Sequence, residues 1–303
     1  MQTSGTILQF FRNPRLIPLL AWGLFMVTGC EDEPIPWEAE DAPTQLVVEG
    51  LLTNEKKQHR IILSRTADYF SNEPTPRVSN ARVTVSSRTD TIRFAELEDQ
   101  PGVYISHETA GKVGRTYTLD IRLNQPLNQK YHFQASESMI RGLILDTLQA
   151  FIYENPLYVE GAPNDSLLLY TTLFGPEPKE INNYYAVRLF RNGESVQDTI
   201  DEVEIYSDTE EFEGDYVNNL LFFTNFQPGD TLGMEVSTVS RNYRRYINGL
   251  QNIVNQSGNP FDLSGPPANA TGNIDGALGY FRVSSVTRAQ TIVEDQRLEK
   301  SPG

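Results

Sequence analysis

The stretch YTLDIRL at residues 117–123 places apolar side chains at every second position, with polar residues between them. This period of two is typical of a half-buried β-strand, because successive side chains point to opposite faces of a sheet. Similar stretches recur between Gly, Pro, Asn and Asp at residues 45–50, 60–64, 81–86, 102–106, 167–173, 184–193, 219–224 and 229–236. Many short strands with turn residues between them predict an all-β fold of tandem β-sandwiches, immunoglobulin-like or transthyretin-like.

The same pattern divides the chain into two β-rich domains, which we expect at residues 44–136 and 137–303. Residues 114–121 and 229–236 share a glycine turn followed by an alternating strand. This match suggests two related folds in tandem, although a turn followed by a strand is common to β-domains in general.

One α-helix is expected at residues 242–255, where apolar side chains recur at steps of three and four. Ser240 or Asn242 is the candidate N-cap. We expect this helix to pack on a sheet. The tail that follows is rich in Gly, Pro and Asn but carries enough apolar residues to be ordered, and a strand at 279–286 should close the second domain.

The N-terminus has the order of a secretory signal peptide at residues 1–29. Arg12 and Arg15 precede an apolar run at 16–27, which ends just before Cys30. This run is too short for a membrane-spanning helix, which needs about 20 residues. The arrangement resembles the bacterial lipobox, in which the cysteine is acylated and becomes the first mature residue. The alternative is an ordinary signal peptide with a chance cysteine; no second cysteine exists for a disulfide within the chain.

Residues 30–43 read as an acidic, proline-containing tether. Glu31, Asp32 and Glu33 follow the cysteine directly. They resemble the export signal that sends Bacteroidetes lipoproteins to the outer face of the outer membrane. A solvated linker has the same composition, and acidic residues here can mean inner-membrane retention in other bacteria.

The charge balance argues against nucleic-acid binding. The formal net charge is −15, and it becomes −17 without residues 1–29, which hold Arg12 and Arg15 and no acid. Phosphate backbones are bound by clustered Lys and Arg, and the sequence shows no basic stripe.

We expect no catalytic residues, metal site or cofactor. The chain has no Gly-x-Ser-x-Gly turn, and His59, His107 and His132 lack metal-binding spacing. Each histidine is expected at the surface or on a strand. A hydrolase with paired carboxylates is the least favoured alternative.

Two features support alternative binding functions. Tyrosines could form a glycan platform, although Tyr is also a common strand residue: Tyr153, Tyr158, Tyr184, Tyr185 and Tyr206. Acidic residues at 201–204 and 208–215 could gather Ca²⁺, which takes six to eight oxygen ligands, or could form a solvated loop.

The triplet of Asp, then Ser or Thr, then an aliphatic residue occurs five times. It resembles the O-glycosylation acceptor of Bacteroidetes proteins that pass through the periplasm. The candidate hydroxyls are those of Thr91, Thr147, Ser166, Thr199 and Thr231. An Asp turn that leads into a strand produces the same triplet.

The chain after Cys30 resembles a Bacteroidetes lipoprotein family known as domain of unknown function 4249. The resemblance covers nearly all of the mature chain and rests on VVEG at 47–50, PGVY at 101–104, GRTYTL at 114–119, NYRRY at 242–246, NPF at 259–261, PPAN at 266–269, GNI at 272–274 and GALGYF at 276–281. It implies a gene neighbour that encodes a TonB-dependent outer-membrane receptor, and it assigns no enzymatic activity. Only the acylation of Cys30 carries over.

Together these features predict a non-enzymatic lipoprotein, anchored to the outer membrane by its acyl chains and facing the cell exterior. We expect it to act as an accessory binding subunit of a TonB-dependent transporter in nutrient uptake. The alternative is a stand-alone glycan- or cation-binding surface lipoprotein.

Overall fold

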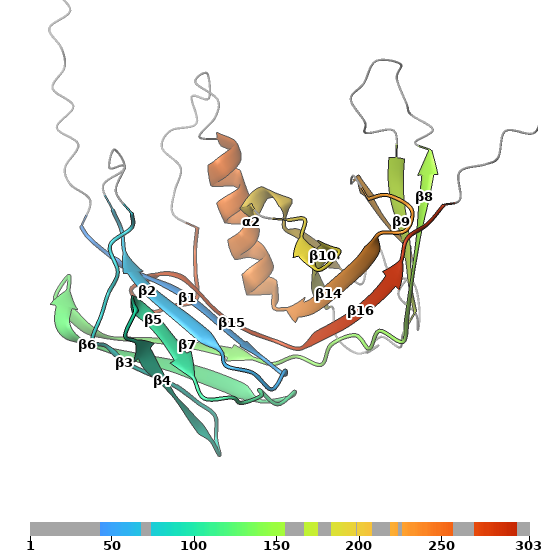
Figure 1. Ribbon diagram of the computed structural model, residues 1–303. Helices are drawn as coiled ribbons and strands as arrows, with labels where there is room; N and C mark the ends of the chain where they lie inside the picture. Colours follow the sequence, from blue (N-terminus) through green and yellow to red (C-terminus); the bar gives the residue numbers. More distant parts are fainter. Residues whose placement is uncertain are drawn as a thin grey trace, which may run out of the picture. The chain divides into compact units, whose positions relative to one another are not determined.

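The computed structural model describes residues 43–67, 74–154, 167–174, 183–197, 199–207, 219–223, 226–256 and 270–295. Most of these residues are in β-strands, and the described residues contain one α-helix, at Arg241–Gln256 (Figure 1). The expected all-β class is therefore confirmed.

An eight-stranded sheet, which we call the N-terminal sheet, has the strand order β15-β1-β2-β5-β4-β3-β6-β7. Its strands are β1 (Leu46–Thr53), β2 (Arg60–Arg65), β3 (Arg82–Ser86), β4 (Thr91–Leu97), β5 (Gln100–Ser106), β6 (Thr116–Leu127), β7 (Lys130–Ser138) and β15 (Leu278–Ser284). Alternate residues are buried along β3, β4 and β6, as the period of two predicts.

The N-terminal sheet surrounds one apolar core. The two edge strands of the sheet both contribute to this core: Phe133 comes from β7 and Phe281 from β15. The terminal strands β15 and β7 also contact each other. The sheet therefore folds over its own buried face.

Two smaller sheets, which we call the paired sheets, pack together over a second core. The five-stranded sheet contains β10 (Tyr184–Arg191), β11 (Glu194–Ser195), β12 (Glu204–Ser207), β14 (Thr231–Val239) and β16 (Val286–Ile292). The four-stranded sheet contains β8 (Thr147–Glu154), β9 (Leu167–Phe174), β13 (Asn219–Phe223) and β17 (Glu294–Asp295). Ile152 and Leu169 of one sheet share their core with Val187 and Met234 of the other, so the two sheets face each other.

The Asn-Gly pair after β10 makes the expected tight turn. Asn192 and Gly193 have φ values of 52° and 91°, and the chain returns as β11, which pairs with β10. Positive φ at both positions is the requirement of a type I′ hairpin turn, which Asn-Gly meets with little strain.

The course of β15 corrects one expectation from the sequence. The sequence predicts a strand at 279–286 that closes the second domain, but β15 pairs with β1 of the N-terminal sheet. The pairing is parallel and runs in register from Val47–Leu278 to Thr53–Ser284. The strand that completes the five-stranded sheet is β16, which pairs with β14. The division at residue 136 stays a prediction, with β15 belonging to the sheet of the earlier part.

The helix α2 (Arg241–Gln256) confirms the expected helix at 242–255. Ser240 is the N-cap, since its Oγ accepts a hydrogen bond from the Tyr243 N–H at 3.1 Å. Tyr243 packs against Tyr184 and Ala186 of β10 on the face turned away from the second core. The ring of Tyr243 also lies edge-on to Tyr280 of β15, so α2 stands between the two sheet systems (Figure 1).

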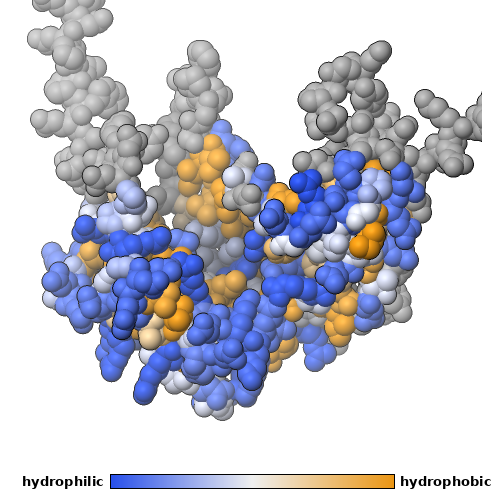
Figure 2. Space-filling model, in the orientation of Figure 1, coloured by the Kyte–Doolittle hydropathy of each residue, from blue (hydrophilic) through white to orange (hydrophobic). Residues whose placement is uncertain are grey.

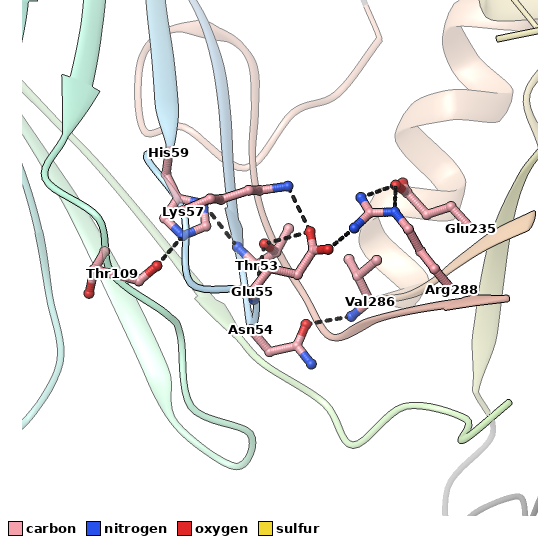
Figure 3. A network of polar contacts seen from close by, with 9 residues as sticks. All are labelled: Thr53, Asn54, Glu55, Lys57, His59, Thr109, Glu235, Val286 and Arg288. Atoms are coloured by element: carbon pink, nitrogen blue, oxygen red, sulfur yellow. Dashed lines mark hydrogen bonds and ion pairs between the residues drawn. The ribbon is translucent and has the colours of Figure 1, made fainter. Parts of the chain in front are cut away.

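A chain of ion pairs joins the turn after β1 to the five-stranded sheet (Figure 3). Glu55 forms ion pairs with Lys57, at 2.7 Å, and with Arg288 of β16. The Arg288 Nε donates to Glu235 Oε2 at 3.0 Å, and the Glu235 side chain is only 8% exposed. Positive and negative side chains alternate in this series of ion pairs, so the buried carboxylate of Glu235 has the Arg288 guanidinium beside it.

Candidate binding groove

The floor of the groove is the outer face of three neighbouring strands, β2, β1 and β15. Two rows of paired residues cross these strands: Ile62, Glu49 and Tyr280 form one row, and Arg60, Leu51 and Arg282 form the next. All six line a groove with a volume of about 510 Å³. They share a face because alternate residues of a strand point the same way, whereas Val48 and Leu52 point into the core.

The wall of the groove is one face of α2. Tyr243, Tyr246, Leu250 and Ile253 follow one another at steps of three and four residues, and Ile247 and Val254 widen this apolar stripe. From residue 243 to residue 254 the stripe is about 16 Å long at 1.5 Å per residue. Figure 2 shows hydrophobic atoms gathered at the surface of α2.

A short 3₁₀-helix, η2 (Ile200–Glu202), lies against α2 and contributes Ile200 to the groove. The side-chain amide of Gln251 holds it there by donating to the carbonyls of Ile200, at 3.1 Å, and Val203, at 2.9 Å. The volume of the groove lies within the range of small-molecule sites, about 300–1,000 Å³.

A partly buried polar cluster fixes the helix wall to the floor. The Tyr280 hydroxyl donates to Glu137 Oε2 at 2.7 Å, and Ser240, the N-cap of α2, contacts both groups at 3.1–3.4 Å. Asn273 Nδ2 lies 3.4 Å from the same carboxylate oxygen. Strands β7 and β15 therefore meet the start of α2 at one carboxyl group.

Burial dominates the electrostatics of this cluster. It raises the pKa of the Glu137 carboxyl, and the hydrogen bonds from Tyr280, Ser240 and Asn273 oppose that shift only in part. Burial raises the pKa of the Tyr246 hydroxyl to about 12, and the pKa of Tyr280 is raised as well. Tyr246 and Tyr280 are thus neutral hydrogen-bonding groups at physiological pH.

Two arginines supply the positive charge of the groove. The Arg282 guanidinium lies 5.0 Å from the ring centre of Tyr243, which is cation–π geometry. Arg60 occupies the same row on the other side of Leu51. Among the residues that the structure describes, neither arginine has a carboxylate within 4.0 Å, although Glu49 lies on the same face. No local sequence pattern indicates these residues, because the residues that line the groove are far apart in the sequence, from Glu49 to Arg282.

The proposed lipidation and export residues, Cys30 and Glu31, Asp32 and Glu33, lie outside the described residues. So do most of the acidic residues proposed for a cation, at 208–215. In the described part of the chain no three His, Cys, Asp or Glu side chains are grouped so that they could hold a metal ion. The helices described there also lack the length and apolar character needed to cross a membrane.

The candidate O-glycosylation sites begin elements of secondary structure. Thr91, Thr147 and Thr231 are the first residues of β4, β8 and β14, and Thr199 immediately precedes η2. Ser166 lies outside the described residues. The Asp230 carboxylate accepts hydrogen bonds from the Gln227 N–H and from Asn192, both at 2.9 Å, so this Asp has a structural role in a turn. Glycosylation at these positions stays a prediction.

The alternative of a glycan platform is contradicted at Tyr184 and Tyr185, which are strand residues as the other interpretation predicts. Tyr184 and Tyr185 are both buried, and as neighbours in β10 they point into different clusters. Tyr206 packs beside the second core, Tyr158 lies outside the described residues, and the position of the Tyr153 side chain is not described. The aromatic side chains that do gather at the groove are those of Tyr243, Tyr246 and Tyr280.

One histidine also departs from expectation. His59 is buried between β1 and the loop at Thr109, where Nδ1 accepts from the Thr53 N–H at 3.5 Å and Nε2 lies 3.0 Å from the Thr109 carbonyl (Figure 3). Burial lowers the pKa of His59, so its neutral form is favoured. His107 and His132 are exposed, as expected, and His132 bonds to Asp120.

The structure is thus that of an all-β chain with an apolar groove between one helix and the outer face of a sheet. Its sequence matches the family described as "Domain of unknown function (DUF4249)" over residues 32–290, and the chain belongs to this family. The resemblance seen in the sequence is therefore confirmed for the family itself.

A search of curated proteins finds no match. Among solved structures, similarity is found to "Cytokine receptor complex - Crystal form 1A", with a TM-score of 0.26 and 10% identity over 80% of this chain and 94% of that one. A second is "Structural insight into host cell surface retention of a 1.5-MDa bacterial ice-binding adhesin", with a TM-score of 0.19 and 9% identity over 84% and 66%. Both likenesses are too weak to inform function.

Proposed function

We propose that this protein is a non-enzymatic, surface-exposed lipoprotein of the outer membrane that binds a ligand in the groove beside α2. In this proposal it is anchored through acylated Cys30 and serves as an accessory subunit of a TonB-dependent receptor in nutrient uptake. The observation that supports binding is the groove itself, with its apolar helix wall and its mixed floor of Tyr, Leu, Ile, Glu and Arg side chains.

The construction of the groove fits a binding role. An apolar lining with a few charged groups is the usual composition of small-molecule sites. The wall does not depend on α2 alone, because Ser240, Tyr280 and Glu137 tie its first turn to two strands of the N-terminal sheet. Such fixed geometry lowers the entropic cost of binding.

The anchor and the partner rest on the sequence. The lipobox-like order before Cys30 and the acids at 31–33 support attachment to the outer membrane. Acyl chains would hold the protein in the same membrane as a transporter barrel, where even a weak contact gains from high local concentration.

The test is a mild-detergent purification of the native lipoprotein from its own membranes, with mass spectrometry of the co-purified proteins. We expect a TonB-dependent barrel in stoichiometric amount, and a mature chain that begins at acylated Cys30. Purification of the lipoprotein alone would contradict the accessory role. An unmodified Cys30 would contradict the anchor.

A groove variant tests whether uptake depends on the groove or on exposed apolar side chains in general. Val254 lines the groove and is 45% exposed, whereas Val113 lies elsewhere and is 43% exposed. Val254→Asp should impair uptake by the transporter without loss of folding, and Val113→Asp is the matched control. Equal uptake by both variants would show that the groove has no part in the function.

A stand-alone glycan binder is the second candidate, because three tyrosines gather at the groove. It predicts that the lipoprotein binds an oligosaccharide in the absence of any barrel and that Tyr246→Ala removes this binding. A stand-alone cation binder has no comparable observation in the described residues.

A further inference from the structure

From the two arginines of the floor we infer that the groove takes an elongated apolar molecule that ends in a carboxylate or a similar anion. The anion would lie over Leu51, between Arg60 and Arg282, and the apolar body would lie along α2. This inference rests on the proposed binding function and adds the chemical class of the ligand.

The register of the sheet places the two arginines for joint binding of one anion. Arg60 and Arg282 both pair with Leu51, from the neighbouring strands β2 and β15. Since adjacent strands lie about 4.8 Å apart, the two Cα atoms are about 10 Å apart with only Leu51 between them. Two long side chains can close that distance onto one carboxylate, and guanidinium groups bind carboxylates with charge-assisted hydrogen bonds.

Arg60 and Arg282 differ from Arg115 and Arg288, which are held in ion pairs, and they differ from Arg82 and Arg93 by their place beside the apolar groove. Arg115 is ion-paired with Asp90, and Arg288 is ion-paired with Glu55 and Glu235. For the guanidinium groups of Arg60 and Arg282, the described residues show one interaction, that of Arg282 with the ring of Tyr243. In a chain with a formal net charge of −15, two arginines that have no carboxylate partner among the described residues form a local site for an anion.

The remaining charge in the groove gives the ligand a direction. Glu49 is the carboxylate on the floor, in the row beside Ile62 and Tyr280, two residues before Leu51. It repels an anion from its own row and leaves the arginine row as the favourable one. Ile247, Leu250, Ile253 and Val254 then offer apolar surface for a chain without charge.

The probe is dodecanoate, kept below its micelle-forming concentration and titrated into the intact mature protein by calorimetry. Dodecyltrimethylammonium, with the same chain and the opposite charge, is the comparison ligand. We expect saturable binding of dodecanoate at one site and binding of the cation that is at least tenfold weaker.

The variants assign that preference to the two residues. The double variant Arg60→Gln/Arg282→Gln should lose at least tenfold in affinity for dodecanoate. The double variant Arg82→Gln/Arg93→Gln is the matched control, because these arginines are exposed on β3 and β4 of the same sheet, away from the groove. Val254→Asp should weaken both probes, since it changes the apolar wall.

Three results would overturn the inference. Equal affinity for the two probes, or an unchanged affinity for dodecanoate in Arg60→Gln/Arg282→Gln, would show that the groove has no preference for an anion. If Val254→Asp still weakened binding in that case, the proposed binding function would stand without the anion. Failure of the wild-type chain to bind dodecanoate would also overturn it.

Discussion

The N-terminal sheet and the paired sheets draw their strands from the sequence in different ways. In the paired sheets, neighbours such as β8 and β9, or β10 and β14, are antiparallel and lie between residues 147 and 239. Among the described strands of these sheets, only β16 and the two-residue strand β17, which pairs in parallel with β8, come from after β15. In the N-terminal sheet, β1 pairs in parallel with β15, which lies about 230 residues later. The comparison shows that one core is nearly complete in its own part of the sequence, whereas the other depends on a remote strand.

The largest expected effect comes from a core residue of that remote strand. Phe281 is fully buried in the core of the N-terminal sheet, so Phe281→Ala should lower the free energy of unfolding by about 4 kcal/mol. Hydrogen exchange should become faster in β1, β2 and β7. The matched variant Phe226→Ala, in the second core, should instead affect β10 and β14. If the two variants gave the same exchange pattern, the cores would unfold as one unit and the contrast would be lost.

A pair of glycines tests the contact between β1 and β15 by backbone geometry. Gly279 has a φ of 90°, and a Cβ at this position would collide with the backbone of Val48. Gly193 has a φ of 91° and open space around it. Gly279→Ala should therefore cost about 3 kcal/mol, and Gly193→Ala about 1 kcal/mol from backbone strain alone. Chemical denaturation of both variants checks the difference, and equal losses would contradict the close approach of β1 and β15.

The ion pairs in Figure 3 sharpen the comparison, because they join the two sheet systems. Arg288→Ala leaves Glu235 buried without a cation and should lower the free energy of unfolding by about 2 kcal/mol. Adding Glu235→Gln to this variant should restore part of the loss, since the buried charge is then removed. If the loss in free energy of unfolding of the double variant equalled the sum of the two single losses, the pair would contribute nothing through its charges.

The smallest expected effect is a dependence on pH at the start of α2. Burial raises the folded-state pKa of Glu137 above its ordinary value of 4.5, so folding favours the protonated carboxyl. Its contribution to stability is complete below that ordinary value and is lost as pH rises through the raised folded-state pKa. Glu137→Gln, which stays neutral, should remove this part of the slope in a denaturation series run upward from pH 4. An identical slope in both proteins would contradict the raised pKa.

Local patterns in the sequence predicted local structure well. The alternation at 117–123, the Asn-Gly turn and the helix all follow from side-chain periodicity and turn chemistry. The sequence left the N-cap open between Ser240 and Asn242, and the structure shows Ser240. The buried positions of Tyr184 and Tyr185 also follow from the period of two, because neighbours in a strand cannot share one face. Of the two interpretations of these tyrosines, the period of two therefore favours ordinary strand residues over a shared platform.

The groove could not be predicted in this way. Its floor depends on the register between β1 and β15, and its wall depends on the contact of α2 with Tyr280. Long-range pairing leaves no periodic signal in either segment, because the hydrophobic pattern fixes which face is buried and not which strand lies beside it. For the same reason Arg60 and Arg282 look like ordinary strand arginines in the sequence.

The parallel pairing of β1 with β15 also has a consequence for the time course of folding. The N-terminal sheet lacks one of its terminal strands until residue 284 has been synthesised, long after β1 itself. At about 5–20 residues per second, the intervening chain of about 230 residues takes roughly 12–46 seconds to make. During that interval the hydrogen-bonding edge of β1 has no β15 beside it. A strand near the end of the chain thus completes the sheet whose first strand is synthesised earliest.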